Sequence, residues 1–185
     1  PTAISLDKTG ASIVGVMGTE KGSAGFLANL DLAGVFSKLL QIGSNSTTAD
    51  SVVRHTDGSF TVVGSSAETL LGKEDVGITD GVLLKVSKAL KITNVVRSSV
   101  SKGSRIWNSA NNSLLLSGEV KSSGKTEVAI TKFSNTYVPS WTYRFPSSGS
   151  AVSGSANQAF FISTGAIAQL AWSPKTPAPL LLTFD

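Results

Sequence analysis

The stretch Asp57-Gly58-Ser59-Phe60-Thr61-Val62-Val63-Gly64 joins a turn pair to a short apolar run that reaches a glycine. Two further strand-like runs follow it along the chain, Val82 to Ser87 and Leu90 to Val96. Asp-Gly is a strong signal for a tight turn, and β-branched and aromatic residues favour strands. The stretch therefore predicts the centre of a small antiparallel sheet.

Two series of strand-like runs repeat along the chain at a similar spacing. In the first series, an apolar run reaches a glycine at Gly18, Gly64, Gly118 and Gly165, which are 46, 54 and 47 residues apart. Each run of the second series consists of two apolar residues, a variable one, a polar one, an apolar one and then Asp or Ser. The four runs are Phe26 to Asp31, Val82 to Ser87, Ala129 to Ser134 and Leu180 to Asp185. A period of about 45 to 55 residues is typical of β-propeller blades.

Further short runs complete each unit. One precedes each glycine-containing run, at residues 3–6, 51–54, 104–107 and 150–153, and an outer one follows in the first three units, at 35–40, 90–96 and 138–143. The sequence thus predicts an all-β chain. The expected fold is a β-propeller of about four blades, each of four short antiparallel strands, and a β-sandwich is the alternative.

The expected blades cover residues 1–43, 44–98, 99–147 and 148–185 of a single domain, which is all or part of a propeller. The last blade has only three predicted strands, because no outer run follows Asp185. We expect a strand from the same polypeptide, or from another chain, to complete this blade, since native proteins avoid exposed apolar edges.

The repeated order of Asp-Gly, apolar strand, glycine, loop, apolar strand and Asp or Ser resembles the degenerate repeats of bacterial secreted β-propeller (SBBP-like) proteins, and more distantly the quinoprotein type. The resemblance covers nearly the whole chain and concerns the blade pattern. It implies an exported or cell-surface, structural or binding protein. A quinone cofactor is not implied, because tryptophan-docking motifs need a Trp in each outer strand and only Trp141 fits.

The composition narrows the possible functions. The chain of 185 residues carries a net charge of +4, and its Lys and Arg residues are scattered, so no nucleic-acid interface is expected. It has no cysteine, which excludes thiol catalysis and cysteine-bound zinc. No apolar run is long enough for a membrane-spanning helix, and we expect no membrane insertion.

Two long loops are the candidate binding site. The loop at residues 65–79 contains Glu68, Glu74 and Asp75 and leads to Asp80, and the loop at residues 166–177 contains Trp172 and Lys175. Both join the second to the third strand of a predicted blade, so we expect them on the same face. Long loops on a rigid scaffold commonly carry function. These six residues are therefore predicted to form a rim that binds a protein or a glycan.

Other candidate residues are expected to be structural. The single histidine, His55, is predicted to flank a turn, because no nucleophile or metal-binding partner lies at a suitable spacing. The acidic stretch of residues 74–81 lacks the spacing of an EF-hand loop. Trp107 and Trp141 lie on predicted strands and are expected in the core. No catalytic residue, metal or cofactor is predicted.

The sequence favours a non-catalytic binding or scaffold propeller that uses the loops on one face. One alternative is a carbohydrate-binding or glycoside-hydrolysing propeller, in which loop carboxylates and Trp172 hold the sugar. A glycosidase needs two carboxyl groups about 5 to 10 Å apart across a cleft. The other alternative is a structural spacer in a larger repeat protein.

Overall fold

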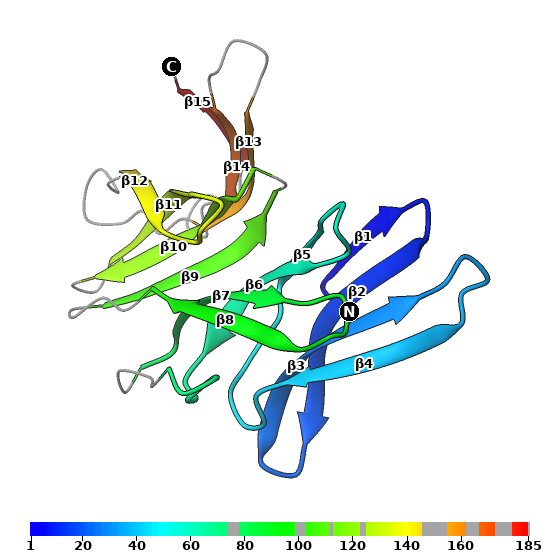
Figure 1. Ribbon diagram of the computed structural model, residues 1–185. Helices are drawn as coiled ribbons and strands as arrows, with labels where there is room; N and C mark the ends of the chain where they lie inside the picture. The colour runs from blue at the N-terminus through cyan, green and yellow to red at the C-terminus, as the bar shows by residue number, and fades with distance from the viewer. Residues whose placement is uncertain are drawn as a thin grey trace. The chain divides into compact units, whose positions relative to one another are not determined.

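The computed structural model describes residues 1–73, 78–98, 103–111, 113–122, 125–145, 155–161, 167–172 and 179–184, and the side chains of most residues up to 144 (Figure 1). These segments contain strands and turns and no helix. The strands form four antiparallel sheets, in each of which neighbours along the chain are neighbours in the sheet. The all-β prediction is confirmed.

Each of the first three sheets has four strands, and the fourth has three. The first sheet contains β1 (Ala3–Asp7), β2 (Gly10–Thr19), β3 (Gly22–Leu30) and β4 (Phe36–Ile42). The second contains β5 (Ser51–Arg54), β6 (Phe60–Ser66), β7 (Asp80–Val86) and β8 (Ile92–Arg97). The third contains β9 (Gly103–Ala110), β10 (Leu115–Ser122), β11 (Lys125–Phe133) and β12 (Pro139–Phe145), and the fourth β13 (Ser155–Phe161), β14 (Ile167–Trp172) and β15 (Pro179–Phe184).

The chain divides into two compact units, Pro1–Ser99 and Val100–Asp185. The first unit holds the first and second sheets, and the second unit holds the third and fourth. The division falls where the second predicted blade gives way to the third.

The pairing register aligns the four sheets residue by residue. On the second and third strands of each sheet, Gly15 is opposite Phe26, Gly64 opposite Val82, Gly118 opposite Ala129, and Ala171 opposite Leu180. In each case Asp or Ser follows five residues after the second member of the pair. The second predicted series is therefore confirmed, because its members occupy the same register position in all four sheets.

The first predicted series is wrong in part. Gly64 and Gly118 lie inside β6 and β10 rather than at the ends of these strands. A Cβ at Gly64 would collide with the carbonyl oxygen of Thr48, and one at Gly118 with that of Ile106. Glycine is required there because the backbone preceding or forming the first strand of the sheet approaches closely. The counterpart in the first sheet is Gly15, not Gly18.

The fourth sheet differs most from the prediction. The segment expected as the loop at residues 166–177 contains β14, and Phe160 and Phe161, expected to begin the second strand, end the first strand, β13. By the register, Ala171 occupies the position that Gly15, Gly64 and Gly118 hold in the other sheets, so the glycine pattern pointed to the wrong strand. The strand predicted at residues 150–153 and the glycine at 165 lie outside the described residues.

In the first three sheets, the Asp or Ser that ends the repeat forms a turn between the third and fourth strands. The backbone N–H groups of Asp31, Ser87 and Ser134 donate to the carbonyl oxygen four residues later, and the side-chain oxygens of the same three residues accept from the backbone N–H at that later position. The residue three positions on, which is Gly34, Leu90 or Tyr137, has a positive φ. The repeat therefore needs a short oxygen-bearing side chain at this position.

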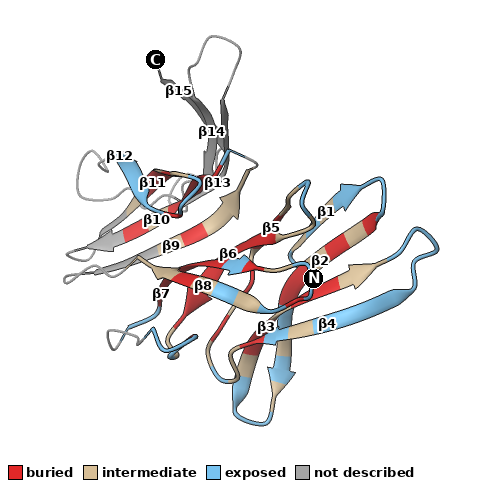
Figure 2. Ribbon diagram, in the orientation of Figure 1, coloured by how far each residue is buried: buried red, intermediate tan, exposed pale blue. Residues whose placement is uncertain are grey.

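The core of the first unit lies between its two sheets. Val14, Leu27 and Ile42 of the first sheet are buried in one cluster with residues of the second sheet, among them Val62 and Leu84. Apart from Lys85, the central strands β6 and β7 are buried on both of their faces, whereas β1 and β4 are largely exposed (Figure 2). Phe60 to Val63 in β6 and Val82 to Leu84 in β7 are accordingly rich in apolar residues at successive positions, which point to opposite faces of the sheet.

Candidate functional site

Three connecting segments gather at one end of the first unit, which we call the loop end. They are the β2–β3 hairpin turn at Glu20 and Lys21, the linker at residues 43–50, and the loop that follows β6. The linker is hydrogen-bonded to both neighbours: Ser23 N–H donates to Asn45 O (2.8 Å), and Ala67 N–H donates to Ser46 O (3.1 Å). Alternating strand direction places the second-to-third strand connections of both sheets at this end.

Glu68 holds the linker in place from the loop after β6. Its carboxylate accepts hydrogen bonds from the backbone N–H groups of Ser44, Asn45 and Ser46 at 2.9 to 3.0 Å, and from the hydroxyl groups of Ser44 (3.0 Å) and Thr47 (2.6 Å). Successive N–H groups that converge on one anion form a backbone nest. In this chain the anion in the nest is an internal side chain.

The nest controls the ionisation of Glu68. Partial burial by itself would raise the pKa of this carboxyl, but the hydrogen bonds from the Thr47 hydroxyl and the linker N–H groups outweigh it and lower the pKa from 4.5 to about 2. Glu68 is therefore ionised at neutral pH and unsuited to donate a proton as a general acid.

Behind Glu68, a buried ion pair ties the loop to the second sheet. Arg97 Nη2 lies 3.1 Å from Asp80 Oδ1, and both side chains are almost fully buried. The guanidinium also donates to the carbonyl oxygens of Glu68 (2.9 Å) and Ser66 (3.0 Å). Arg97 thus connects the last strand of the sheet, the start of its third strand and the loop that carries Glu68.

The same ion pair recurs in the third sheet. Arg97 is opposite Val82 and Arg144 is opposite Ala129, which are equivalent register positions, and the acidic partners Asp80 and Glu127 lie two residues before these. The Glu127–Arg144 pair is partly exposed to solvent, unlike the pair in the second sheet. In the first sheet, Ala24 and Gln41 occupy these positions.

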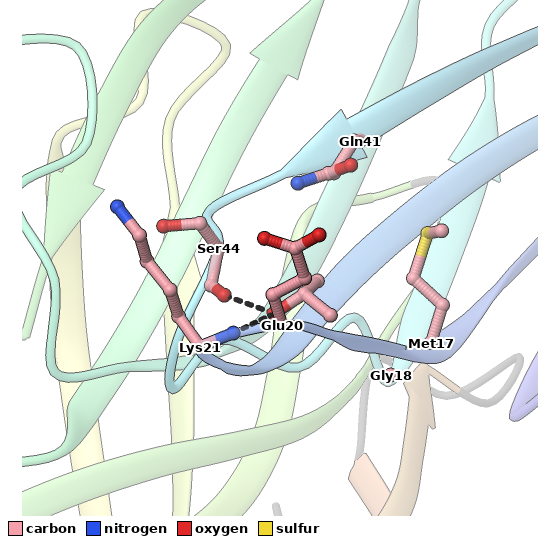
Figure 3. Close-up of a pocket in the computed structure, with 7 residues that line it drawn as sticks. Met17, Gly18, Glu20, Lys21, Gln41 and Ser44 are labelled. Atoms are coloured by element: carbon pink, nitrogen blue, oxygen red, sulfur yellow. Dashed lines mark hydrogen bonds between the residues drawn. The ribbon is translucent and has the colours of Figure 1, made fainter.

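A shallow depression of about 320 Å³ lies at the loop end beside the hairpin turn (Figure 3). Glu20 and Lys21 of the turn form one side, and Gln41 and Ser44 lie across from them. The Thr19 hydroxyl donates to the Ser44 carbonyl oxygen, so the turn and the linker are connected at its floor. With both charge signs and amide and hydroxyl groups exposed, the depression suits polar contacts with a partner surface.

The structure separates the six predicted rim residues. Glu68 and Asp80 lie together at the loop end, where their carboxylates hold the linker and Arg97. Trp172 is the last residue of strand β14 and not part of a loop. Glu74, Asp75 and Lys175 lie outside the described residues, as do most of the connections around β14.

The other predicted residues have structural contacts. His55 Nε2 lies 2.7 Å from the Thr61 hydroxyl, and burial lowers the pKa of this imidazole although Asp57 acts to raise it. Trp107 is buried, with its ring 5.4 Å from that of Phe133 in an edge-to-face arrangement, as predicted. The prediction for Trp141 is wrong: this side chain is 39% exposed on β12.

Sequence reasoning missed Arg97 and the linker. A lone Arg at the end of the apolar run that leads to Val96 was the available signal, because a long cation in such a strand needs a buried partner. The serine- and threonine-rich linker at residues 44–48 gave no comparable signal, since its role depends on backbone N–H groups.

Comparison with known proteins supplies no family: no protein-family model matches the chain, and no curated protein matches it. Among the described residues, no helix is long and apolar enough to cross a membrane, and no group of three or more potential ligands is placed to hold a metal ion. The function must therefore be argued from the loop end itself.

Proposed function

We propose that the chain is a non-catalytic binding and scaffold module whose sheets stack as β-propeller blades and whose loop end contacts another macromolecule. The proposal rests on the contacts that the polar residues at the loop end make. The carboxylates of Glu68 and Asp80 at the loop end hold neighbouring segments in place, and the exposed groups Glu20 and Lys21 border only a shallow depression.

The blade arrangement is supported by the register. The four sheets repeat the same order of strands along the chain, and three of them repeat the same bulge and the same turn between the third and fourth strands. Sheets that are apolar on both faces cannot be stable alone and stack on their neighbours. The blade pattern of bacterial secreted β-propeller repeats agrees with this proposal and with an extracellular or cell-surface location.

The carbohydrate-active alternative receives less support. A retaining or inverting glycosidase needs one carboxyl group that carries a proton at working pH. Glu68 has a lowered pKa, and Asp80 is buried against Arg97. The predicted stacking residue, Trp172, belongs to a strand.

The proposal is tested by charge reversal at the two ends of the first unit. Labelled chain is applied to arrays of purified bacterial surface proteins and of glycans, together with the variants Lys21→Glu/Lys73→Glu at the loop end and Lys8→Glu/Lys88→Glu at the opposite turns. All four lysines are exposed. We expect to find a ligand that the loop-end double variant no longer binds and that the control double variant still binds.

Equal loss in both pairs, or binding that neither pair changes, would contradict a binding site at the loop end. A chain that retains nothing on either array would favour the structural spacer. Selective retention of a glycan would bring back the carbohydrate-binding alternative.

A further inference from the structure

Leu71 is an exposed residue in an unfavourable backbone conformation. In the described part of the chain, four residues other than glycine have a positive φ. Three of them, Leu90, Leu114 and Tyr137, are 8%, 4% and 7% exposed, so burial of their side chains offsets the cost of the conformation. Leu71, with a φ of 48°, is 58% exposed. Burial of its side chain therefore offers much less compensation.

Leu71 is the first central residue of a tight turn at the loop end. Backbone hydrogen bonds in both directions between Leu70 and Lys73, at 3.1 and 2.9 Å, close this turn. Gly72, the second central residue, also has a positive φ, of 70°. Positive φ at both central residues is characteristic of a type I′ turn, which strongly prefers Asn-Gly at these positions. The chain has Leu-Gly instead, so the residue at 71 departs from the one that the turn alone would favour.

The segment before the turn is fixed by three contacts. Leu70 is 5% exposed and belongs to the apolar core of the first unit. Two residues earlier, Glu68 binds the linker through its carboxylate and accepts a hydrogen bond from Arg97 through its carbonyl oxygen. The turn is thus held at its base, while Leu71 at its tip is exposed. An anchor that is pre-organised in this way loses little conformational freedom on binding.

We propose that Leu71 is the anchor of the loop end and inserts into an apolar pocket of a partner protein. This rests on the proposed function, and it specifies the partner as a protein with a pocket of leucine size rather than a glycan. Departures from the locally favoured residue persist at functional sites, where another interaction compensates for them. The exposed residues Thr69 and Lys73 beside the turn supply the polar rim that surrounds an apolar centre in protein–protein contacts.

The test applies variants of the full chain to the same protein and glycan arrays. Leu71→Asn suits the turn and removes the apolar side chain, whereas Leu71→Met keeps a large apolar side chain. Leu32→Asn is the control, because Leu32 is 78% exposed in the turn at the opposite end of the first sheet. We expect Leu71→Asn to weaken binding to an array protein at least about 10-fold, and the other two variants to change it less than about 3-fold.

Thermal unfolding distinguishes an anchor from a residue that supports the fold. We expect Leu71→Asn to retain or raise the melting temperature while it loses binding, because Asn tolerates the positive φ better than Leu. A lower melting temperature would show that Leu71 supports the fold and would overturn the proposal. Leu71→Cys should react with a thiol reagent as fast as Leu32→Cys. Slower reaction would show that another part of the chain covers the turn, which also overturns the proposal.

The array results separate the anchor from the proposed function. An array protein that the loop-end double variant no longer binds, but that Leu71→Asn still binds, would overturn the anchor and leave the binding site at the loop end. A ligand that is a glycan, or a protein whose binding neither variant changes, would also contradict the anchor. A wild-type chain that binds nothing on either array would contradict both proposals.

Discussion

Arg97 and Asp80 form a buried ion pair, 3.1 Å apart, at the point where the second sheet meets the loop end. A buried charge left without its partner is strongly destabilising, whereas loss of both partners is tolerated much better. The same register positions hold Ala24 and Gln41 in the first sheet, which shows that an uncharged solution fits this backbone.

A double-mutant cycle on this pair therefore has a defined expectation. Arg97→Gln alone should cost about 3 to 5 kcal/mol in the free energy of unfolding, and Asp80→Ala/Arg97→Gln should recover a large part of the loss. Urea denaturation measures both. The partly exposed pair Glu127→Ala/Arg144→Gln is the control and should change stability by less than about 1 kcal/mol. Equal costs for the single and double variants of the buried pair would contradict the assigned role.

Acid stability should depend on Glu68. A carboxyl whose folded pKa lies below its unfolded value stabilises the fold above the unfolded pKa, and this contribution is lost as the pH falls from about 4.5 to about 2. The shift corresponds to about 3 kcal/mol, which solvent screening of this partly exposed group reduces to about 1 to 2 kcal/mol.

Glu68→Gln should therefore lower the free energy of unfolding at pH 7 by about 1 to 2 kcal/mol, and the difference from the wild type should disappear by about pH 2. Glu20→Gln, in the exposed hairpin turn, is the control and should leave the acid limb of the stability curve unchanged. If the stability of the Glu68 variant falls with acid in the same way as that of the wild type, the nest does not hold the linker.

His55 should make the fold sensitive to mild acid. Burial lowers its pKa in the folded state below 6.5, so the folded protein favours the neutral imidazole. Stability from this group is complete above pH 6.5 and falls as the pH drops through 6.5, because the unfolded chain binds the proton first. His55→Asn should flatten the decline in melting temperature between pH 7 and pH 5, and Thr56→Asn, an exposed neighbour, should not. If the melting temperature of the His55 variant declines as steeply as that of the wild type, groups other than His55 cause the decline.

Substitution by glycine should have opposite effects on stability at two leucines with positive φ. Leu71 (φ 48°) is exposed, whereas Leu90 (φ 58°) is buried in the core of the first unit. The left-handed conformation costs a non-glycine residue about 1 to 2 kcal/mol, and burial of a Leu side chain contributes more than this. We expect Leu71→Gly to stabilise by about 0.5 kcal/mol and Leu90→Gly to destabilise by about 2 kcal/mol, measured by thermal unfolding. Destabilisation of similar size in both would contradict this reasoning.

The order of strands and turns could be predicted because the same types of residue recur at the same positions of each repeat. The run that ends in Asp31, Ser87 or Ser134 is specified by apolar alternation and by the oxygen that the turn requires. The glycine series misled because it was interpreted as a strand end. Gly64 and Gly118 instead lie inside their strands, where backbone atoms approach too closely for a Cβ.

The candidate site was less predictable because its function depends on contacts distant in sequence. A run of acidic residues in a loop suggests a ligand rim, but Glu68 turns inward onto the backbone of residues 44–46. Asp80 likewise has its partner 17 residues along the chain, at Arg97. The loops that contain Glu74, Asp75 and Lys175 lie outside the described residues, so their part in a rim stays a prediction.

The proposed blade arrangement is tested most directly by distances between spin labels, since the chain has no cysteine to remove. One label replaces Lys21 at the loop end of the first sheet, and the second replaces either Ser122 or Thr136, at opposite ends of the third sheet. In a propeller all connections between second and third strands share one face, so the distance from Lys21 to Ser122 should be the shorter of the two. A shorter distance from Lys21 to Thr136 would contradict the blade arrangement.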